Sequence, residues 1–96
     1  RVLAPQAANE LLTIKGVKAS FVVYKGEGET CISARSDGRL DVAEIMEQMG
    51  GGGNTVMAAS QLPGVGRYTA VRRLERVIRA YTENAKDITD EGETRN

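Results

Sequence analysis

The spacing of apolar and polar residues predicts a helix followed by two strands in the first part of the chain. After Pro5, residues 6–16 (QAANELLTIKG) carry apolar side chains at helical spacing and finish on a glycine, which is typical of a helix and its C-cap. Residues 17–25 (VKASFVVYK) are apolar at odd and even positions, which indicates a strand covered on both faces. Residues 30–36 (TCISARS) form a returning strand, and the glycines between the two strands indicate a hairpin.

The second part of the chain predicts three helices. Asp41 and Glu44 have the spacing of a capping box, and apolar residues follow at helical spacing up to Gly50. Residues 55–62 are rich in small side chains and are predicted as a short, closely packed helix. After a Pro-Gly break, residues 67–85 form an amphipathic helix. The expected fold class is α/β: a small sheet with a β-hairpin packed by helices on at least one face, with further strands missing if the chain is cut.

Composition narrows the chemistry that this chain can perform. Among 96 residues there is no histidine, which excludes a histidine base, nucleophile pair or metal ligand. The single cysteine, Cys31, excludes an internal disulfide and a thiolate zinc cluster and fits a reducing cytoplasm. Thirteen basic and thirteen acidic residues cancel, so net charge gives no argument for a nucleic-acid or membrane partner.

The ends of the chain suggest a piece of a longer protein. The sequence starts at Arg1 without a methionine, and no apolar run approaches the roughly 20 residues that span a bilayer. We expect one domain over residues 1–85 and a polar, frayed tail over residues 86–96. A fragment without a catalytic base is expected to contribute binding rather than chemistry.

Four consecutive glycines, residues 50–53, raise two interpretations. Bare glycine between short packed elements is compatible with a tight turn. Alternatively, backbone N–H groups left uncovered before a helix capped by Asn54 or Thr55 would bind a phosphate or carboxylate. The run is not a P-loop, because no Gly-Lys-Ser/Thr follows it.

Arginines stand out at two places in the sequence. Arg35 shares one face of the second strand with Ser33, and its guanidinium needs a hydrogen-bond acceptor there. A salt bridge to a nearby carboxylate, or a strand edge exposed to water, is the simpler explanation for an arginine at this position. The last helix carries four arginines away from its apolar stripe, which is more often a solvated face than a nucleic-acid surface.

Residues 32–62 (ISARSDGRLDVAEIMEQMGGGGNTVMAASQL), together with residues 11–23 (LLTIKGVKASFVV), resemble the C-terminal DHH-associated domain of DHH phosphoesterases. The order and spacing of the Ile-Ser-Ala-Arg-Ser strand, the Ile-Met-Glu helix, the glycines and the Ala-Ala pair are most similar to those of bacterial membrane-bound cyclic-di-AMP phosphodiesterases of the GdpP type. The resemblance covers about two-thirds of the chain.

The resemblance implies a division of labour between two domains. A preceding DHH domain, outside this chain, would hold manganese ions that activate water for attack on phosphorus, so no catalytic or metal-binding residue is expected here. The associated domain would bind the substrate, with side chains holding a phosphate or base and glycines approaching through the backbone. The residues implied in binding are Ser33, Arg35, Ser36, Gly50, Gly51, Gly52, Gly53 and Asn54.

Asn54 departs from the family pattern, which has a histidine after the glycines. An asparagine donates a neutral hydrogen bond but cannot titrate or carry charge. The implied partners are cyclic-di-AMP, a linear dinucleotide or short RNA, the DHH domain of the same chain, and a second copy in a homodimer. The implied location is a cytoplasmic domain of a membrane-anchored protein.

Two other functions stay open. One is a non-catalytic single-stranded nucleic-acid binding module, as in exonucleases or tRNA-editing proteins, using the arginines of the last helix. The other is a degenerate regulatory or dimerisation domain, for which Asn54 is the best support.

Overall fold

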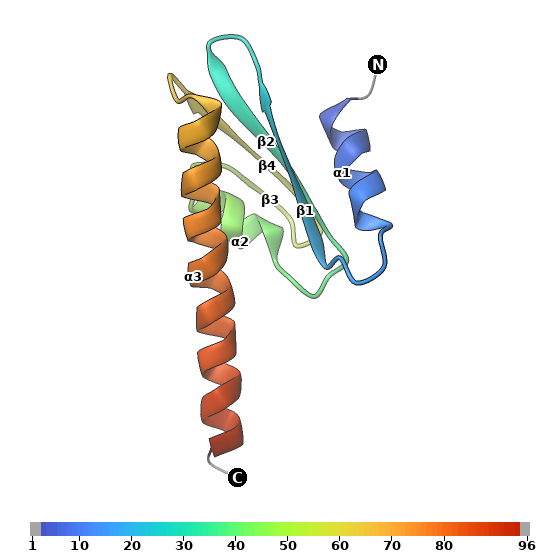
Figure 1. Ribbon diagram of the computed structural model, residues 1–96, viewed down its shortest axis with the longest axis vertical. Coiled ribbons are helices and arrows are strands. Elements are labelled where there is room, and N and C mark those ends of the chain that lie inside the picture. Colours follow the sequence, from blue (N-terminus) through green and yellow to red (C-terminus); the bar gives the residue numbers. More distant parts are fainter. Residues whose placement is uncertain (1–2, 95–96) are drawn as a thin grey trace.

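The computed structural model describes residues 3–94, with the side chains of residues 3–84. Four antiparallel strands form one sheet in the order β1-β2-β4-β3 (Figure 1). The predicted α/β class, a small sheet with a hairpin packed by helices, is confirmed. In chain order, the elements are α1 (Ala4–Leu12), β1 (Ala19–Lys25), β2 (Glu29–Ser36), α2 (Val42–Glu47), β3 (Gly52–Gly53), β4 (Met57–Pro63) and α3 (Arg67–Thr94).

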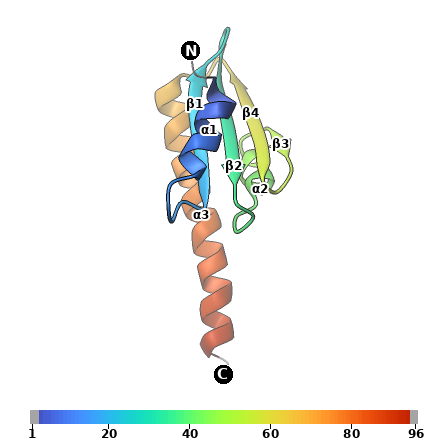
Figure 2. The ribbon, with the colours of Figure 1, turned by 90° about the vertical axis from the view of Figure 1, so that its right-hand side faces the viewer.

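Helices cover the sheet from both sides. Figures 1 and 2 show α1 on one face and α2 with α3 on the other. The α1 helix lies over β1 and β2, where Ser20 Oγ donates a hydrogen bond to the Ala8 carbonyl at 2.6 Å. On the other face of β1, Phe21 and Val23 pack against the core beside α3. The prediction of a first strand covered on both faces is therefore correct.

The hydrophobic core lies between the sheet and the pair α2 and α3. It takes alternate residues of the two central strands and one side of each helix, as the periods of strand and helix require. The buried cluster consists of Ile32, Ala34, Val42, Ile45, Met46, Met49, Ala58, Leu62, Ala70 and Leu74.

The helix predicted over residues 55–62 is wrong, because this segment is the central strand β4. Ala58, Ser60 and Leu62 are buried while the residues between them are exposed, which is the period of a strand. Methionine, alanine and glutamine favour helix locally, but pairing with β2 on one side and β3 on the other overrides that weak preference. The small side chains do allow close packing, as predicted, but between strands.

The α2 helix begins where its sequence indicates but ends at Glu47, three residues before the predicted Gly50. Asp41 Oδ1 accepts hydrogen bonds from the N–H groups of Ala43 and Glu44 at 3.0 and 3.3 Å. The other half of the predicted capping box is replaced, since the Asp41 N–H donates to the Tyr81 hydroxyl of α3 at 3.0 Å. At the other end Gly50 has φ +80°, the left-handed conformation that terminates helices.

Two other helix boundaries differ from the predicted ones. The α1 helix ends at Leu12, before Gly16, which lies at φ +88° in the turn leading to β1. The α3 helix is 28 residues long and reaches Thr94, projecting beyond the sheet in Figure 1. The side chains of residues 86–96 lie outside the described part, so the frayed polar tail stays a prediction. Among the described helices, none combines the length and the apolar character needed to cross a membrane.

Candidate functional site

The face of the sheet that α1 covers only in part carries three of the eight residues implied in binding: Ser33, Arg35 and Gly52. Antiparallel pairing aligns Gly52 with Ala59 and Ala59 with Ser33, so these three positions form one row across the sheet. Arg35 pairs with Met57 in the row beside it. We call this surface the open face: Ser33, Arg35, Gly52, Met57 and Ala59.

Arg35 is anchored at the edge of α1. Its Nε donates to Asn9 Oδ1 at 3.0 Å and its Nη1 donates to the Ala34 carbonyl at 2.9 Å. Neither alternative suggested by the sequence applies: β2 is a central strand rather than an exposed edge, and within residues 3–84 no carboxylate pairs with Arg35. Two of the five guanidinium N–H groups are used, which leaves three for an outside acceptor.

The two serines implied in binding have different environments. Ser33 is 4% exposed, and its hydroxyl makes no hydrogen bond to another residue in the range 3–84. Ser36 lies on the opposite face of β2, where its hydroxyl donates to the Leu40 carbonyl at 2.6 Å and accepts from the Gly38 N–H at 2.9 Å. The Ser36 hydroxyl therefore stabilises the turn after β2, away from the open face.

Three of the four glycines have a structural reason within this domain. Gly50 takes the left-handed conformation at the end of α2, and the next N–H, that of Gly51, donates to the Met46 carbonyl at 2.8 Å. A Cβ on Gly51 would lie 2.0 Å from the Ala59 carbonyl oxygen, and one on Gly53 would lie 2.5 Å from the Ala58 Cα. These two glycines allow the chain to run closely against β4.

Gly52 is the exception. A Cβ at this position meets nothing within 4 Å, and the backbone does not have a positive φ. Its row on the sheet places that empty space on the open face, beside Ala59. The described residues of the domain would therefore tolerate a side chain at Gly52.

Asn54 shapes the turn between β3 and β4. Its Oδ1 accepts from the N–H groups of Val56 and Met57 at 3.1 and 3.0 Å, while its own N–H donates to the Met57 carbonyl at 2.8 Å. The predicted capping role is therefore exercised on a strand-to-strand turn instead of a helix. The side-chain NH₂ makes no hydrogen bond within residues 3–84 and stays available as a donor.

The described residues contain no group of three or more His, Cys, Asp and Glu side chains able to hold a metal ion. Cys31 lies on the same face of β2, two residues before Ser33, but it is buried, and burial together with Glu29 raises the pKa of its thiol. A neutral buried thiol is a poor nucleophile. The open face thus carries the Arg35 guanidinium, the Ser33 hydroxyl and the backbone around Gly52.

Sequence reasoning missed three residues of this site. Asn9 gives no local signal, because only the packing of α1 on the sheet brings it to Arg35. Met57 and Ala59 were predicted in a helix; the apolar Ala58 and Leu62 lie four residues apart, a spacing that fits a helix as well as a strand. Their place on this face follows from the pairing of β4 with β2 and β3, which the local sequence does not signal.

Comparison with known proteins identifies the family. The DHHA1 domain matches residues 3–87, so the chain belongs to the DHHA1 domain family. The resemblance stated from the sequence is therefore confirmed.

Several curated relatives are similar over most of this chain. It is 46% identical over 89 residues to the cyclic-di-AMP phosphodiesterase GdpP of Geobacillus thermodenitrificans, covering 92% of the chain and 14% of that protein. It is 45% identical over 84 residues to GdpP of Bacillus subtilis, covering 86% of the chain and 13% of that protein. The cyclic-di-AMP phosphodiesterase PdeA of Listeria monocytogenes is 44% identical over 81 residues, which cover 83% of the chain and 12% of PdeA. The chain thus spans about one-seventh of the length of these relatives.

Proposed function

We propose that this chain is the substrate-binding domain of a phosphodiesterase that hydrolyses cyclic-di-AMP. The observation that carries the proposal is Gly52, the glycine without a structural reason, which lies on the open face beside Arg35 and Ser33. Relatives named cyclic-di-AMP phosphodiesterases, at 44–46% identity, support the choice of substrate.

The anionic part of the ligand would meet Arg35. A guanidinium binds a phosphate through two parallel hydrogen bonds, and Arg35 has three N–H groups left for this purpose. Ser33 Oγ lies two residues before it on the same face and can donate to a further phosphate oxygen. The missing side chain at Gly52 would allow the sugar-phosphate backbone to approach β3 closely.

The apolar part of the ligand would meet Met57 and Ala59. Both side chains are exposed on β4, and Met57 is 50% exposed, so both are accessible to a ligand. A methionine sulfur and its methylenes pack well on a flat aromatic ring such as adenine. Phosphate contacts on one side and apolar contacts on the other suit a dinucleotide.

The catalytic step would take place in a second domain. We propose a DHH domain of the same protein that holds manganese ions, because this chain belongs to the DHHA1 family, the DHH-associated domain. A linear dinucleotide or a short RNA would use the same contacts as cyclic-di-AMP. The domain would work on the cytoplasmic side of a membrane-anchored protein, as a monomer or a homodimer.

A calorimetric titration of the whole chain with cyclic-di-AMP, and another with the linear dinucleotide, test this proposal. We expect binding of at least one of them, and an affinity at least about tenfold weaker for Gly52→Val, because the new side chain fills the space beside Ala59. Gly66→Val is the matched control, since Gly66 also has open space and lacks a positive φ but lies in the loop before α3.

Folded protein that binds neither dinucleotide would overturn recognition by this domain. Equal weakening by Gly52→Val and Gly66→Val would show that the open face is not the binding surface.

A regulatory or degenerate role is the second candidate, and the observation that favours it is Asn54 in the place of the family histidine. Higher hydrolysis by the full-length protein carrying Asn54→His would support that candidate.

A further inference from the structure

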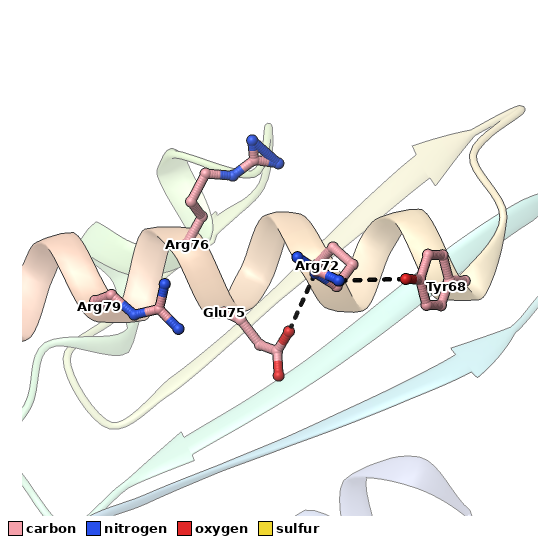
Figure 3. A pocket seen from close by; sticks show the side chains of 5 residues that line it. All are labelled: Tyr68, Arg72, Glu75, Arg76 and Arg79. Atoms are coloured by element: carbon pink, nitrogen blue, oxygen red, sulfur yellow. Dashed lines mark hydrogen bonds and ion pairs between the residues drawn. The ribbon is translucent and has the colours of Figure 1, made fainter.

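The first turns of α3 place an exposed tyrosine beside several arginines. Tyr68 is the second residue of the helix, directly after the loop of residues 64–66. Figure 3 shows a hollow of about 570 Å³ on this helix, lined by Tyr68, Arg72, Glu75, Arg76 and Arg79. We call these five residues the arginine hollow. The sheet separates it from the open face, because α3 packs on the face opposite to α1.

Tyr68 contributes nothing to the hydrophobic core. It is 75% exposed, the highest value among the exposed large apolar and aromatic residues of the described part of the chain. Its hydroxyl accepts a hydrogen bond from Arg72 Nη1 at 3.2 Å, and the Arg72 guanidinium carbon lies 5.9 Å from the ring centroid. Cation–π contacts at exposed sites are weak. The hydroxyl is therefore accessible from solvent, and the fold does not depend on it.

The arginine hollow has more positive than negative charge. Arg72 reaches Glu75 at 3.7 Å, and Arg76 and Arg79 form no ion pair with any residue in the range 3–84. Three guanidinium groups therefore share one carboxylate, which leaves a net charge of +2. The first turn of α3 also has no acidic residue, although a negative charge is favourable at the N-terminus of a helix. A negative charge added at the Tyr68 hydroxyl would thus meet favourable electrostatics.

We propose that Tyr68 is a phosphorylation site whose phosphate is held by the arginine hollow. The Tyr68 hydroxyl oxygen attacks the terminal phosphorus of a nucleoside triphosphate on a separate kinase. The bond from that phosphorus to the bridging oxygen breaks, the nucleoside diphosphate leaves, and the hydroxyl proton passes to a base of the kinase. Arg72 already contacts this hydroxyl, and a guanidinium holds a phosphate by two hydrogen bonds. The roughly two negative charges of the phosphate would cancel the net charge of the hollow.

The other two tyrosines of the chain lack these features and provide an internal comparison. Tyr81 is half-buried against the core, and its hydroxyl accepts from the Asp41 N–H at 3.0 Å, so a phosphate there would break the contact between α3 and α2. Tyr24 is 37% exposed on β1, and within residues 3–84 its hydroxyl receives no hydrogen bond from an arginine. Only Tyr68 combines an accessible hydroxyl with an adjacent guanidinium.

The first experiment tests the accessibility of the site. The whole 96-residue chain is incubated with ATP and the catalytic domain of a protein tyrosine kinase of broad specificity, and the phosphate is located by mass spectrometry. We expect phosphorylation of Tyr68 at least about fivefold faster than that of Tyr24 or Tyr81, because its hydroxyl is reached without local unfolding. Tyr68→Phe should remove most of the incorporated phosphate. No phosphate on Tyr68, or equally fast phosphorylation of Tyr24, would overturn the proposal.

The second experiment tests whether the arginines hold the phosphate. Phosphotyrosine is incorporated at position 68 during translation, and phosphotyrosine at position 24 is the matched control. We expect the modification at position 68 to raise the melting temperature by about 3 °C, through new ion pairs at the surface. By phosphorus NMR, the second pKa of its phosphate should be lower than that of the phosphate at position 24, because guanidinium groups favour the more highly charged form.

The rise in melting temperature should disappear in Arg72→Gln/Arg76→Gln and persist in Arg39→Gln, which removes an exposed arginine away from α3. Equal phosphate pKa values at positions 68 and 24 would overturn the proposal, as would an unchanged melting temperature. Neither result affects the dinucleotide titration of the open face, which lies on the other side of the sheet.

Discussion

The two faces of β2 are built by alternate residues of one strand, yet they have different uses. Ile32 and Ala34 point into the core beneath α2 and α3, and both are 0% exposed. Ser33 and Arg35 point to the side of α1, where Arg35 keeps three N–H groups without partners in the range 3–84. A helix of only nine residues covers this second side, and it leaves β4 and β3 uncovered.

The difference teaches where each face obtains its stability. The core face is stabilised by burial of apolar side chains, which does not require a specific partner for each atom. The other face depends on individual contacts such as the bond between Arg35 and Asn9. Substitutions on the core face should therefore lower the free energy of unfolding. Substitutions on the open face should instead lower the affinity for the ligand.

Among the substitutions that test this comparison, Gly51→Ala should have the largest effect. The new Cβ would lie 2.0 Å from the Ala59 carbonyl oxygen of the neighbouring strand, so the pairing of β3 with β4 must shift. We expect the free energy of unfolding to fall by about 3 kcal/mol or more, measured by urea denaturation. Gly52→Ala, the neighbouring control, should change it by less than about 1 kcal/mol. Equal losses for the two variants would contradict the assignment of different roles.

Arg35→Ala should act on function rather than on folding. In the full-length protein we expect transition-state stabilisation to fall by at least about 2 kcal/mol, the scale of a charge-assisted phosphate contact, seen as a loss in kcat/KM. Arg39→Ala serves as control, since Arg39 is exposed and pairs with Asp37 at 2.6 Å in the turn after β2. Unchanged turnover with Arg35→Ala would show that Arg35 does not contact the substrate.

A smaller effect is expected from Asn9→Ala, which removes the acceptor that orients Arg35. The loss in dinucleotide affinity should be about 1 kcal/mol, the net value of one hydrogen bond. In a chain that already carries Arg35→Ala, the same substitution should have no further effect, because Asn9 acts through Arg35. Additive losses in the double variant would show that Asn9 contacts the ligand independently.

The smallest effect is expected for the reactivity of the Cys31 thiol. This reactivity tests how completely α1 and the hairpin cover the α1 side of β2. Burial, followed by the hydrogen bond and charge of Glu29, raises the pKa of the thiol above the ordinary value of 9.0. The thiol should therefore react slowly with a disulfide reagent in the folded protein and rapidly in urea. A raised pKa in the folded state also means that this group contributes its stability below pH 9 and loses it as the pH rises through the folded pKa. Equally fast reaction in both states would show that Cys31 is accessible.

Several elements could be predicted from the sequence because their signals are local. The hairpin of β1 and β2 follows from apolar runs separated by glycines, and the start of α2 follows from Asp41, whose side chain caps it. The apolar stripe of α3 follows from helical spacing. Arg35 could be identified as unusual because a guanidinium in a central strand needs acceptors. The order of motifs also identified the DHHA1 family, which the comparisons confirm.

What only the tertiary structure decided lies in segments made of small residues. Alanine, serine and glycine have weak local preferences, so β4 is a strand because Ala59 pairs with Ser33 and Gly52, not because of its own sequence. The same pairing gives neighbouring glycines different environments. Gly51 must be a glycine because it packs against β4, whereas Gly52 faces empty space. The sequence determined which chemical groups are present. Packing of elements distant in the chain determined which of them, like Asn9 and Arg35, meet on one face.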